Sequence, residues 1–328
     1  MVKERCAMKR FKNILFVLGN CTDETSPSLR RAIALAKINQ ADLTLLHVLP
    51  KHPLSSYSKK LGISNQEFKD KVEAHEEARL HRLFSSLEPD FGIRTELRFG
   101  KRYIETIHAV QSESFDLVIK EADADGWLSR YLGSDDMHLL RKCPCPVWLM
   151  KKDEKLDYRN IMAAVDFGTR EDKANSDALN QSILDLACSL SLPDLARVHI
   201  VNVYDVPQSG FISLWVENPE KVEQEMAEDE RRHRQYRMEA LLEGLKSKMG
   251  EEAYHYLSLR PHVVPGIPDR DLPKMADTIK ADLVVMGTVA RTGIAGVIVG
   301  NTAEAVLSQL QCSVLAIKPE GFECPILK

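Results

Sequence analysis

The chain has 328 residues, of which 44% are hydrophobic and 28% charged, and its formal net charge is −4. These values are typical of soluble globular proteins, and a slightly acidic chain has no long-range attraction for nucleic acid or for an anionic membrane. No apolar run approaches the roughly 20 residues of a membrane-spanning helix. The run Ile14–Leu18 is also too short for a signal-peptide core. We therefore expect a cytoplasmic protein that binds neither nucleic acid nor membrane and is long enough for two domains.

The cysteines do not indicate a disulfide framework, because there are seven of them, scattered along a chain that is not small. Cys143 and Cys145, with His138 upstream, fit no common zinc spacing. A structural role for this Cys-Pro-Cys segment before a strand is the simpler interpretation, and we expect no metal site there.

The first half of the chain predicts strands and helices in alternation. Its apolar runs of strand length are Asn13–Leu18, Leu43–Val48, Thr95–Phe99, Phe115–Ile119 and Cys145–Leu149. Between the first two runs, Leu29–Ile38 has apolar residues three and four positions apart, which is typical of a helix. A second helical stripe is formed by Leu80, Leu83, Phe84 and Leu87.

The second half repeats this pattern in the same order. Its strand-like runs are Asn160–Val165, Val198–Val203, Leu257–Val264, Ala281–Val285 and Cys312–Ala316. Helical patterns cover Ala178–Leu190 and the stripe from Met238 to Met249, and we interpret the charge run Glu228–Arg234 as a solvated helix face. The offset between the copies grows from 147 (160 − 13) to 167 (312 − 145), so the second copy carries insertions, chiefly around residues 204–220.

Continuous Val, Ile and Leu runs indicate strands that are buried on both faces, as in a parallel sheet with flanking helices. We therefore predict an α/β protein with two tandem domains, residues 1–152 and 158–320, each with a five-stranded parallel sheet. The short, charged segment Lys151–Tyr158 would link them. Ligands of such sheets bind at the carboxyl ends of the strands where the strand order reverses, so a site would follow the first, second and fourth strands of a copy.

A glycine-rich segment follows the fourth strand of the second copy and runs from Met286 to Glu304. Gly287 allows a turn and a close approach of a ligand to the backbone. Gly300, Asn301 and Thr302 would open a helix whose amides suit a phosphate, with Asn301 as the N-cap and Glu304 closing a capping box. Taken alone, such a turn is a weak indicator, because many α/β proteins use one only for packing.

Residues Ala281–Thr288, Arg291–Gly293 and Val299–Glu304 together resemble the fourth-strand motif of universal stress proteins. ATP-binding members of that family have Gly, two residues, Gly, nine residues, Gly and then Ser or Thr. This chain keeps the spacing but has Ala290 for the second Gly and Asn301 for the hydroxyl residue. The resemblance implies an adenine nucleotide α-hydrolase-like fold and a site for ATP or a related nucleotide, accompanied by Mg²⁺.

The resemblance extends to the first two strands of the second copy. It implies that Asp166, after the first strand, contacts the nucleoside and that the backbone of Val203 meets the adenine. Asp166 precedes Gly168 and is also a residue type favoured in turns, so both roles stay open. The complete set of expected site residues is Ala164, Asp166, Val203, Gly287, Ala290, Arg291, Gly300, Asn301 and Thr302.

The first copy matches by strand order but lacks this site. Gly19 stands in place of the Asp, and the acidic segment Glu121–Asp125 stands in place of the glycine turn. Its three carboxylates would repel a triphosphate, although paired acids can also bind Mg²⁺ or act in acid–base catalysis. A solvated turn is the simpler interpretation, and we predict a first domain without a nucleotide.

Three functions from different classes are open: a regulatory nucleotide ligand in a stress response, a structural or partner-binding protein, and an ATP-cleaving enzyme. The enzyme ranks last, because Asp166–Glu171 does not match the Ser-Gly-Gly-x-Asp-Ser loop of related pyrophosphatases and no Walker-type Gly-x-x-x-x-Gly-Lys-Ser/Thr loop occurs. Ala290 and Asn301 favour the structural role, whereas Asp166, Gly287 and Gly300 favour the nucleotide.

The family resemblance also implies how the two copies associate. Universal stress proteins commonly pair through the edges of their fifth strands, so the two copies would form an intramolecular pseudo-dimer. Two such chains could also associate as a homodimer. The sequence does not identify protein partners.

Overall fold

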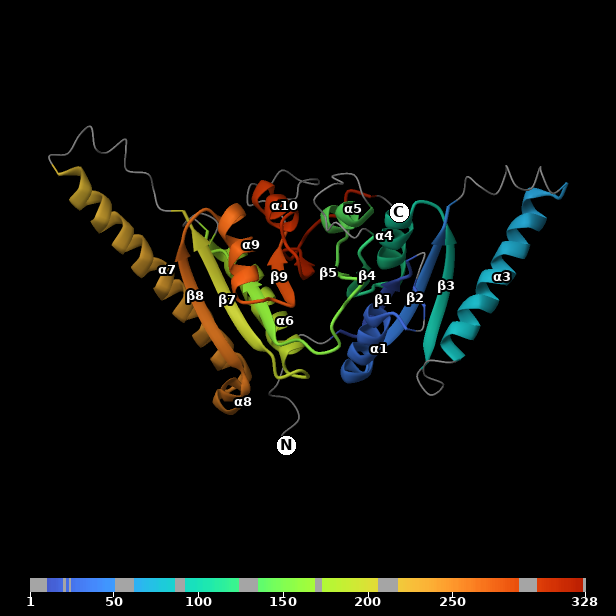
Figure 1. Cartoon of the computed structure of the whole chain (residues 1–328), viewed down its shortest axis with the longest axis horizontal. Helices are drawn as coiled ribbons and strands as arrows, with labels where there is room; N and C mark the ends of the chain where they lie inside the picture. The colour runs from blue at the N-terminus through green and yellow to red at the C-terminus, as the bar shows by residue number, and fades with distance from the viewer. Residues whose placement is uncertain are drawn as a thin grey trace. The chain divides into compact units, whose positions relative to one another are not determined.

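The computed structural model describes residues 11–19, 22–23, 25–50, 62–85, 92–123, 135–168, 173–205, 218–288 and 300–326. These residues form two compact units (Figure 1). The first repeat contains residues 11–156 and, from the C-terminus, residues 322–326, whereas the second repeat contains residues 157–288 and 300–321.

The first repeat is built on a parallel sheet with the strand order β3-β2-β1-β4-β5. Its strands are β1 (Asn13–Val17), β2 (Asp42–Leu49), β3 (Ile93–Phe99), β4 (Leu117–Glu121) and β5 (Val147–Met150). Its helices are α1 (Pro27–Asn39), α3 (Asn65–Ser85), α4 (Arg102–Glu113) and α5 (Asp135–Lys142). Strand β4 ends two residues later than predicted and so includes Lys120 and Glu121.

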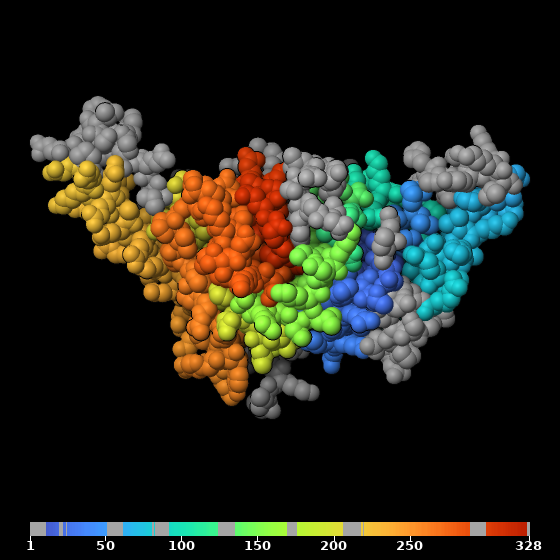
Figure 2. Space-filling model, viewed as in Figure 1, coloured from blue at the N-terminus to red at the C-terminus, as the bar shows by residue number. Residues whose placement is uncertain are grey.

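The second repeat has the same topology, with the strand order β10-β9-β6-β7-β8. Its strands are β6 (Asn160–Ala164), β7 (Arg197–Tyr204), β8 (Ser258–Pro265), β9 (Leu283–Gly287) and β10 (Ser313–Ile317). Its helices are α6 (Lys173–Ser191), α7 (Pro219–Met249), α8 (Glu251–Tyr256), α9 (Pro268–Thr278) and α10 (Asn301–Leu307). Helix α6 packs against α7, α7 runs along β8 (Figure 1), and α9 packs against α10 (Figure 2).

The central strands of both repeats are buried on both faces, which confirms the predicted α/β fold with parallel sheets and flanking helices. Leu15 and Phe16 of β1 and Val284 and Val285 of β9 are each fully buried. In each repeat the chain adds its second and third strands on one side of the first strand, and its fourth and fifth on the other. The strand order therefore reverses between β1 and β4, and between β6 and β9. None of the described helices combines the length and apolar character that a membrane span requires.

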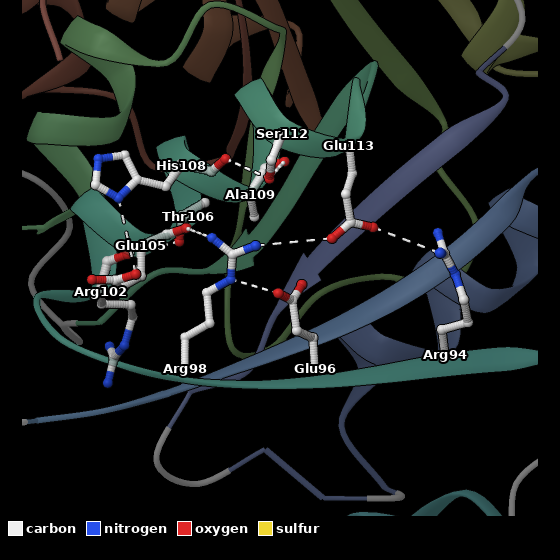
Figure 3. Close-up of polar contacts among 10 residues, drawn as sticks. All are labelled: Arg94, Glu96, Arg98, Arg102, Glu105, Thr106, His108, Ala109, Ser112 and Glu113. Carbon is white, nitrogen blue, oxygen red and sulfur yellow. Dashed lines mark hydrogen bonds and ion pairs between the residues drawn. The ribbon is translucent and has the colours of Figure 1, made fainter. Parts of the chain in front are cut away.

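The edge strand β3 carries charged side chains that form ion pairs with one another and with α4 (Figure 3). Glu113 of α4 lies 3.6 Å from Arg94 and 3.8 Å from Arg98, and Glu96 pairs with Arg98. Surface pairs of this kind contribute little to stability. Charges on an edge strand do, however, discourage pairing with another chain.

Candidate functional site

The candidate site of the second repeat lies where β6 and β9 end, at the reversal of strand order. These two strands are parallel neighbours, with Ala164 opposite Met286. Asp166 follows two residues after Ala164, and Gly287 directly follows Met286. The structure therefore brings Ala164, Asp166 and Gly287 together at the carboxyl ends of these two strands.

The backbone of Asp166 is held by a side chain from α6. The Asp166 N–H donates to Oδ1 of Asn180 at 3.0 Å, and Nδ2 of Asn180 donates to the Asp166 carbonyl at 2.8 Å. The Ser176 hydroxyl donates to the same carbonyl. Asn180 is buried, whereas Asp166 is exposed. Sequence reasoning missed Asn180, and the available signal was a polar residue on a helix whose buried residues are mostly apolar.

Two arginines of α7 hold Phe167, the residue after Asp166. Nη1 of Arg234 donates to the Phe167 carbonyl at 3.1 Å. The Arg237 guanidinium lies 5.4 Å from the centre of the buried Phe167 ring and pairs with Asp177. The prediction that residues 228–234 form a solvated face is therefore wrong for Arg234, because α7 packs against α6 and β8 and the Arg234 side chain reaches the Phe167 carbonyl.

The end of β7 completes this side of the site. Val203 is buried and lies opposite Val264 of β8. Its neighbour Asn202 is fully buried, and Nδ2 of Asn202 donates to the Val165 carbonyl at 3.0 Å, which ties the ends of β6 and β7 together. Burial raises the pKa of the adjacent Tyr204 phenol.

A backbone hydrogen bond joins the end of β9 to the start of α10. The Gly300 N–H donates to the Thr288 carbonyl at 3.1 Å, which places the start of α10 beside the end of β9. Thr288 is fully buried, and its hydroxyl accepts a hydrogen bond from the buried Lys318 ammonium group. Lys318 thus brings a positive charge to this end of the sheet, which sequence reasoning did not anticipate.

The predicted cap of α10 is wrong by one residue. The N-cap is Gly300, whose carbonyl accepts from the Glu304 N–H at 3.0 Å, and no side chain caps the helix. Asn301 is already the first helical residue, so its side chain cannot cap the helix and the capping box with Glu304 does not form. Asn301 and Thr302 are exposed at the start of α10. Ala290 and Arg291 lie outside the described residues.

Gly287 also has a packing role. A Cβ atom at this position would lie 2.8 Å from Cδ2 of Leu179, a separation that real Cβ atoms essentially never show. The Leu179 side chain of α6 therefore lies directly against Gly287, and a larger residue here would require this side chain to move.

The equivalent end of the first repeat is occupied by an ion-pair network. The Lys120 side chain is fully buried, and its Nζ lies 2.7 Å from Asp136 and 2.8 Å from Asp123. Asp123 also pairs with Arg102 at 2.8 Å, and Glu121 accepts from the Ser28 hydroxyl at 2.8 Å. The acidic segment is therefore more than the solvated turn that we predicted, because Ser28 of α1, Arg102 of α4 and Lys120 of β4 are partners of its carboxylates. Asp125 lies outside the described residues.

Cys143 and Cys145 are buried free thiols whose sulfur atoms are 3.7 Å apart. Their mutual hydrogen bond and burial raise the pKa of Cys145. Within the described ranges, no group of three or more His, Cys, Asp or Glu side chains is arranged to hold a metal ion.

Comparison with known proteins identifies the family. The model of the universal stress protein family matches residues 10–151 and 157–318, that is, both repeats. The chain belongs to the universal stress protein family.

Two relatives and one solved structure illustrate the similarity. Universal stress protein E homolog of Haemophilus influenzae is 30% identical over 320 residues, which cover 94% of this chain and 98% of that protein. Universal stress protein E of Escherichia coli K12 is 29% identical over 333 residues, with coverages of 97% and 98%. The crystal structure of a functionally unknown protein from Pseudomonas aeruginosa PAO1 superposes with a TM-score of 0.64 at 25% identity, over 96% of this chain and 95% of that one.

Proposed function

We propose that this universal stress protein acts in the cytoplasm in a stress response and binds a nucleotide such as ATP in its second repeat as a regulatory ligand. The observation that carries the proposal is the position of Asp166 and Gly287, side by side at the carboxyl ends of β6 and β9. This is the point of strand-order reversal, where open α/β sheets bind their ligands.

The surrounding residues support an anionic ligand with a nucleoside attached. Asp166 would contact the nucleoside, and Ala164 would lie next to the nucleoside at the end of β6. The backbone of Val203 would meet the adenine. The phosphates would extend from Gly287 towards the segment that contains Ala290 and Arg291 and ends at Gly300, Asn301 and Thr302. The Lys318 ammonium near Thr288 adds positive charge at that end, and Mg²⁺ would offset further phosphate charge. The proposal assigns no catalytic residue.

Calorimetric titration of the purified chain with ATP and Mg²⁺ at fixed salt tests the proposal. We expect one site per chain, since Lys120 and its partners occupy the equivalent position in the first repeat. Asp166→Ala removes a charged hydrogen-bond acceptor and should weaken binding about tenfold. Glu121→Gln, a matched change in the first repeat, should leave the affinity unchanged. Binding that is unaffected by Asp166→Ala but lost in Glu121→Gln would reverse the assignment of the site.

A ligand-free structural or partner-binding protein is the second candidate. It is favoured by Ala290 and Asn301, which depart from the family's nucleotide motif, and by the Leu179 side chain, which lies close to Gly287. Native mass spectrometry of freshly purified protein separates the two candidates. A co-purified nucleotide mass supports the first, whereas an unliganded chain that also gives no heat with ATP supports the second.

A further inference from the structure

Asn180 of α6 holds the backbone of Asp166 with two hydrogen bonds. Its carboxamide accepts from the Asp166 N–H at 3.0 Å and donates to the Asp166 carbonyl at 2.8 Å. A primary amide carries a donor and an acceptor side by side, so one side chain satisfies both backbone groups of one residue. Asn180 is only 2% exposed, which shields both hydrogen bonds from competition with water.

Residues 166 and 167, which follow β6, are held by side chains of two helices, while the Asp166 side chain is exposed. Asn180 and Ser176 of α6 hold Asp166, and Arg234 and Arg237 of α7 hold Phe167. The backbone conformation at Asp166 is thereby set before any ligand arrives. A carboxylate on a backbone held in this way loses less entropy on binding than one on a free loop.

The first repeat provides an internal comparison. The chain there has Gly19 after β1 in place of an aspartate, and the Gly19 N–H donates to the hydroxyl of Thr22 in the same loop at 2.9 Å. Within the described part of that repeat, no carboxamide from α1 holds this residue. The two-point contact from the following helix therefore occurs in the repeat that has the aspartate.

We propose that Asn180 is a positioning residue for the nucleotide: it sets the direction of the Asp166 carboxylate and influences ligand affinity only through Asp166. This role rests on the proposed function. Asn180, a buried residue of α6, would then be one of the residues that determine the affinity for the nucleotide.

A double-mutant cycle on the full chain tests the role, with ATP and Mg²⁺ as the titrated probe. Asn180→Leu should weaken ATP binding about tenfold in the parent protein, because the carboxylate loses its fixed direction. In the Asp166→Ala background the same change should weaken binding less than about twofold, since no carboxylate is left to position. Gln181→Leu is the matched control: Gln181 is the next residue of α6 and hydrogen-bonds Asp185, so affinity should not change.

The cycle distinguishes a positioning role from a structural one. Equal losses in both backgrounds would mean that Asn180 supports the fold in general, and an unchanged affinity in the parent background would mean that its contact is irrelevant to the ligand; either result overturns the proposal. Asn180→Ala, which leaves space for water, should give the same pattern if the leucine variant does not fold. The parent titration comes first, and no ATP binding there would overturn the proposed function and this role together.

Discussion

Lys120 and Asp166 show how differently single residues are used at equivalent ends of the two sheets. Lys120 is fully buried and satisfied by the carboxylates of Asp123 and Asp136. Asp166 is exposed, and its backbone is held by Asn180 and Ser176. A buried ammonium group is tolerated only when it is paired, so the first repeat has a fixed internal network where the second presents a carboxylate to solvent.

Removal of Lys120 should therefore strongly destabilise the first repeat. Lys120→Met leaves Asp136 buried without its cation, and the expected loss is about 3–5 kcal/mol of unfolding free energy. Native-state hydrogen exchange of the β4 amides in increasing urea measures it. Lys151→Met is a matched control, because Lys151 is more exposed and pairs with the exposed Asp153, so its loss should stay below about 1 kcal/mol. A Lys120→Met protein as stable as this control would show that the network contributes nothing.

At the scale of elements, the same face of the edge strand carries different side-chain chemistry in the two repeats. In β3 this face carries Arg94, Glu96 and Arg98, paired with α4 (Figure 3). In β8 it carries His262, whose Nε2 lies 3.0 Å from Nδ1 of His199 on β7. The two imidazole rings are nearly parallel, with centroids 5.2 Å apart, so the two nitrogens face each other and share one N–H···N hydrogen bond.

The histidine pair should make the second repeat sensitive to acid. Burial lowers the pKa of both rings below the ordinary value of 6.5, and at His199 the neighbouring His262, Arg197 and Arg260 lower it further. A histidine whose pKa is lowered by folding contributes stability that is present above pH 6.5 and is lost as the pH falls through the lower, folded value. Protonation of His199 would therefore place its new charge beside those of Arg197 and Arg260.

Urea unfolding between pH 7.5 and about 5 measures this loss. A His199→Gln, His262→Gln double variant should lose less stability on acidification than the parent protein, and hydrogen exchange should place the difference in β7 and β8. His233→Gln, a change at an exposed histidine of α7, is the control and should keep the parent pH dependence. An identical pH dependence in parent and double variant would contradict the role of the pair.

At the scale of the whole molecule, the two repeats are not simply two consecutive segments of the chain. The last described residues belong to the first repeat, where Nε2 of Gln111 on α4 donates to the carbonyl of Ile326 at 2.9 Å. The chain thus returns to its first repeat after completing the second. Strands β5 and β10 are the outermost strands of their own sheets on the side of the fourth strand. Apolar edges of this kind need a partner.

We expect β5 and β10 to pair with each other within one chain as a pseudo-dimer. Their backbone amides should then exchange with solvent as slowly as those of the central strands β1 and β9, and more slowly than those of the edge strands β3 and β8. Dilution should not change this protection, because the pairing is intramolecular. Protection that falls on dilution would indicate pairing between chains, and fast exchange at both strands would contradict any pairing of these edges.

The sequence by itself determined the alternation of elements, the repeat and the family resemblance, because these depend on local patterns. Runs such as Ile14–Leu18 and Ala281–Val285 specify buried strands from their composition alone. The order of strands and helices then places Asp166 and Gly287 at the same end of the sheet. The sequence was less reliable at boundaries, where the cap of α10 shifted by one residue to Gly300.

Only the tertiary structure decided which polar groups meet. Lys120 and Asp136 are 16 positions apart, and Asp166 and Asn180 are 14 apart. Each pair joins a strand end to a helix, and its contact depends on the depth and rotation at which that helix packs on the sheet. No local periodicity encodes those two quantities, since they follow from the close packing of the apolar side chains between helix and sheet.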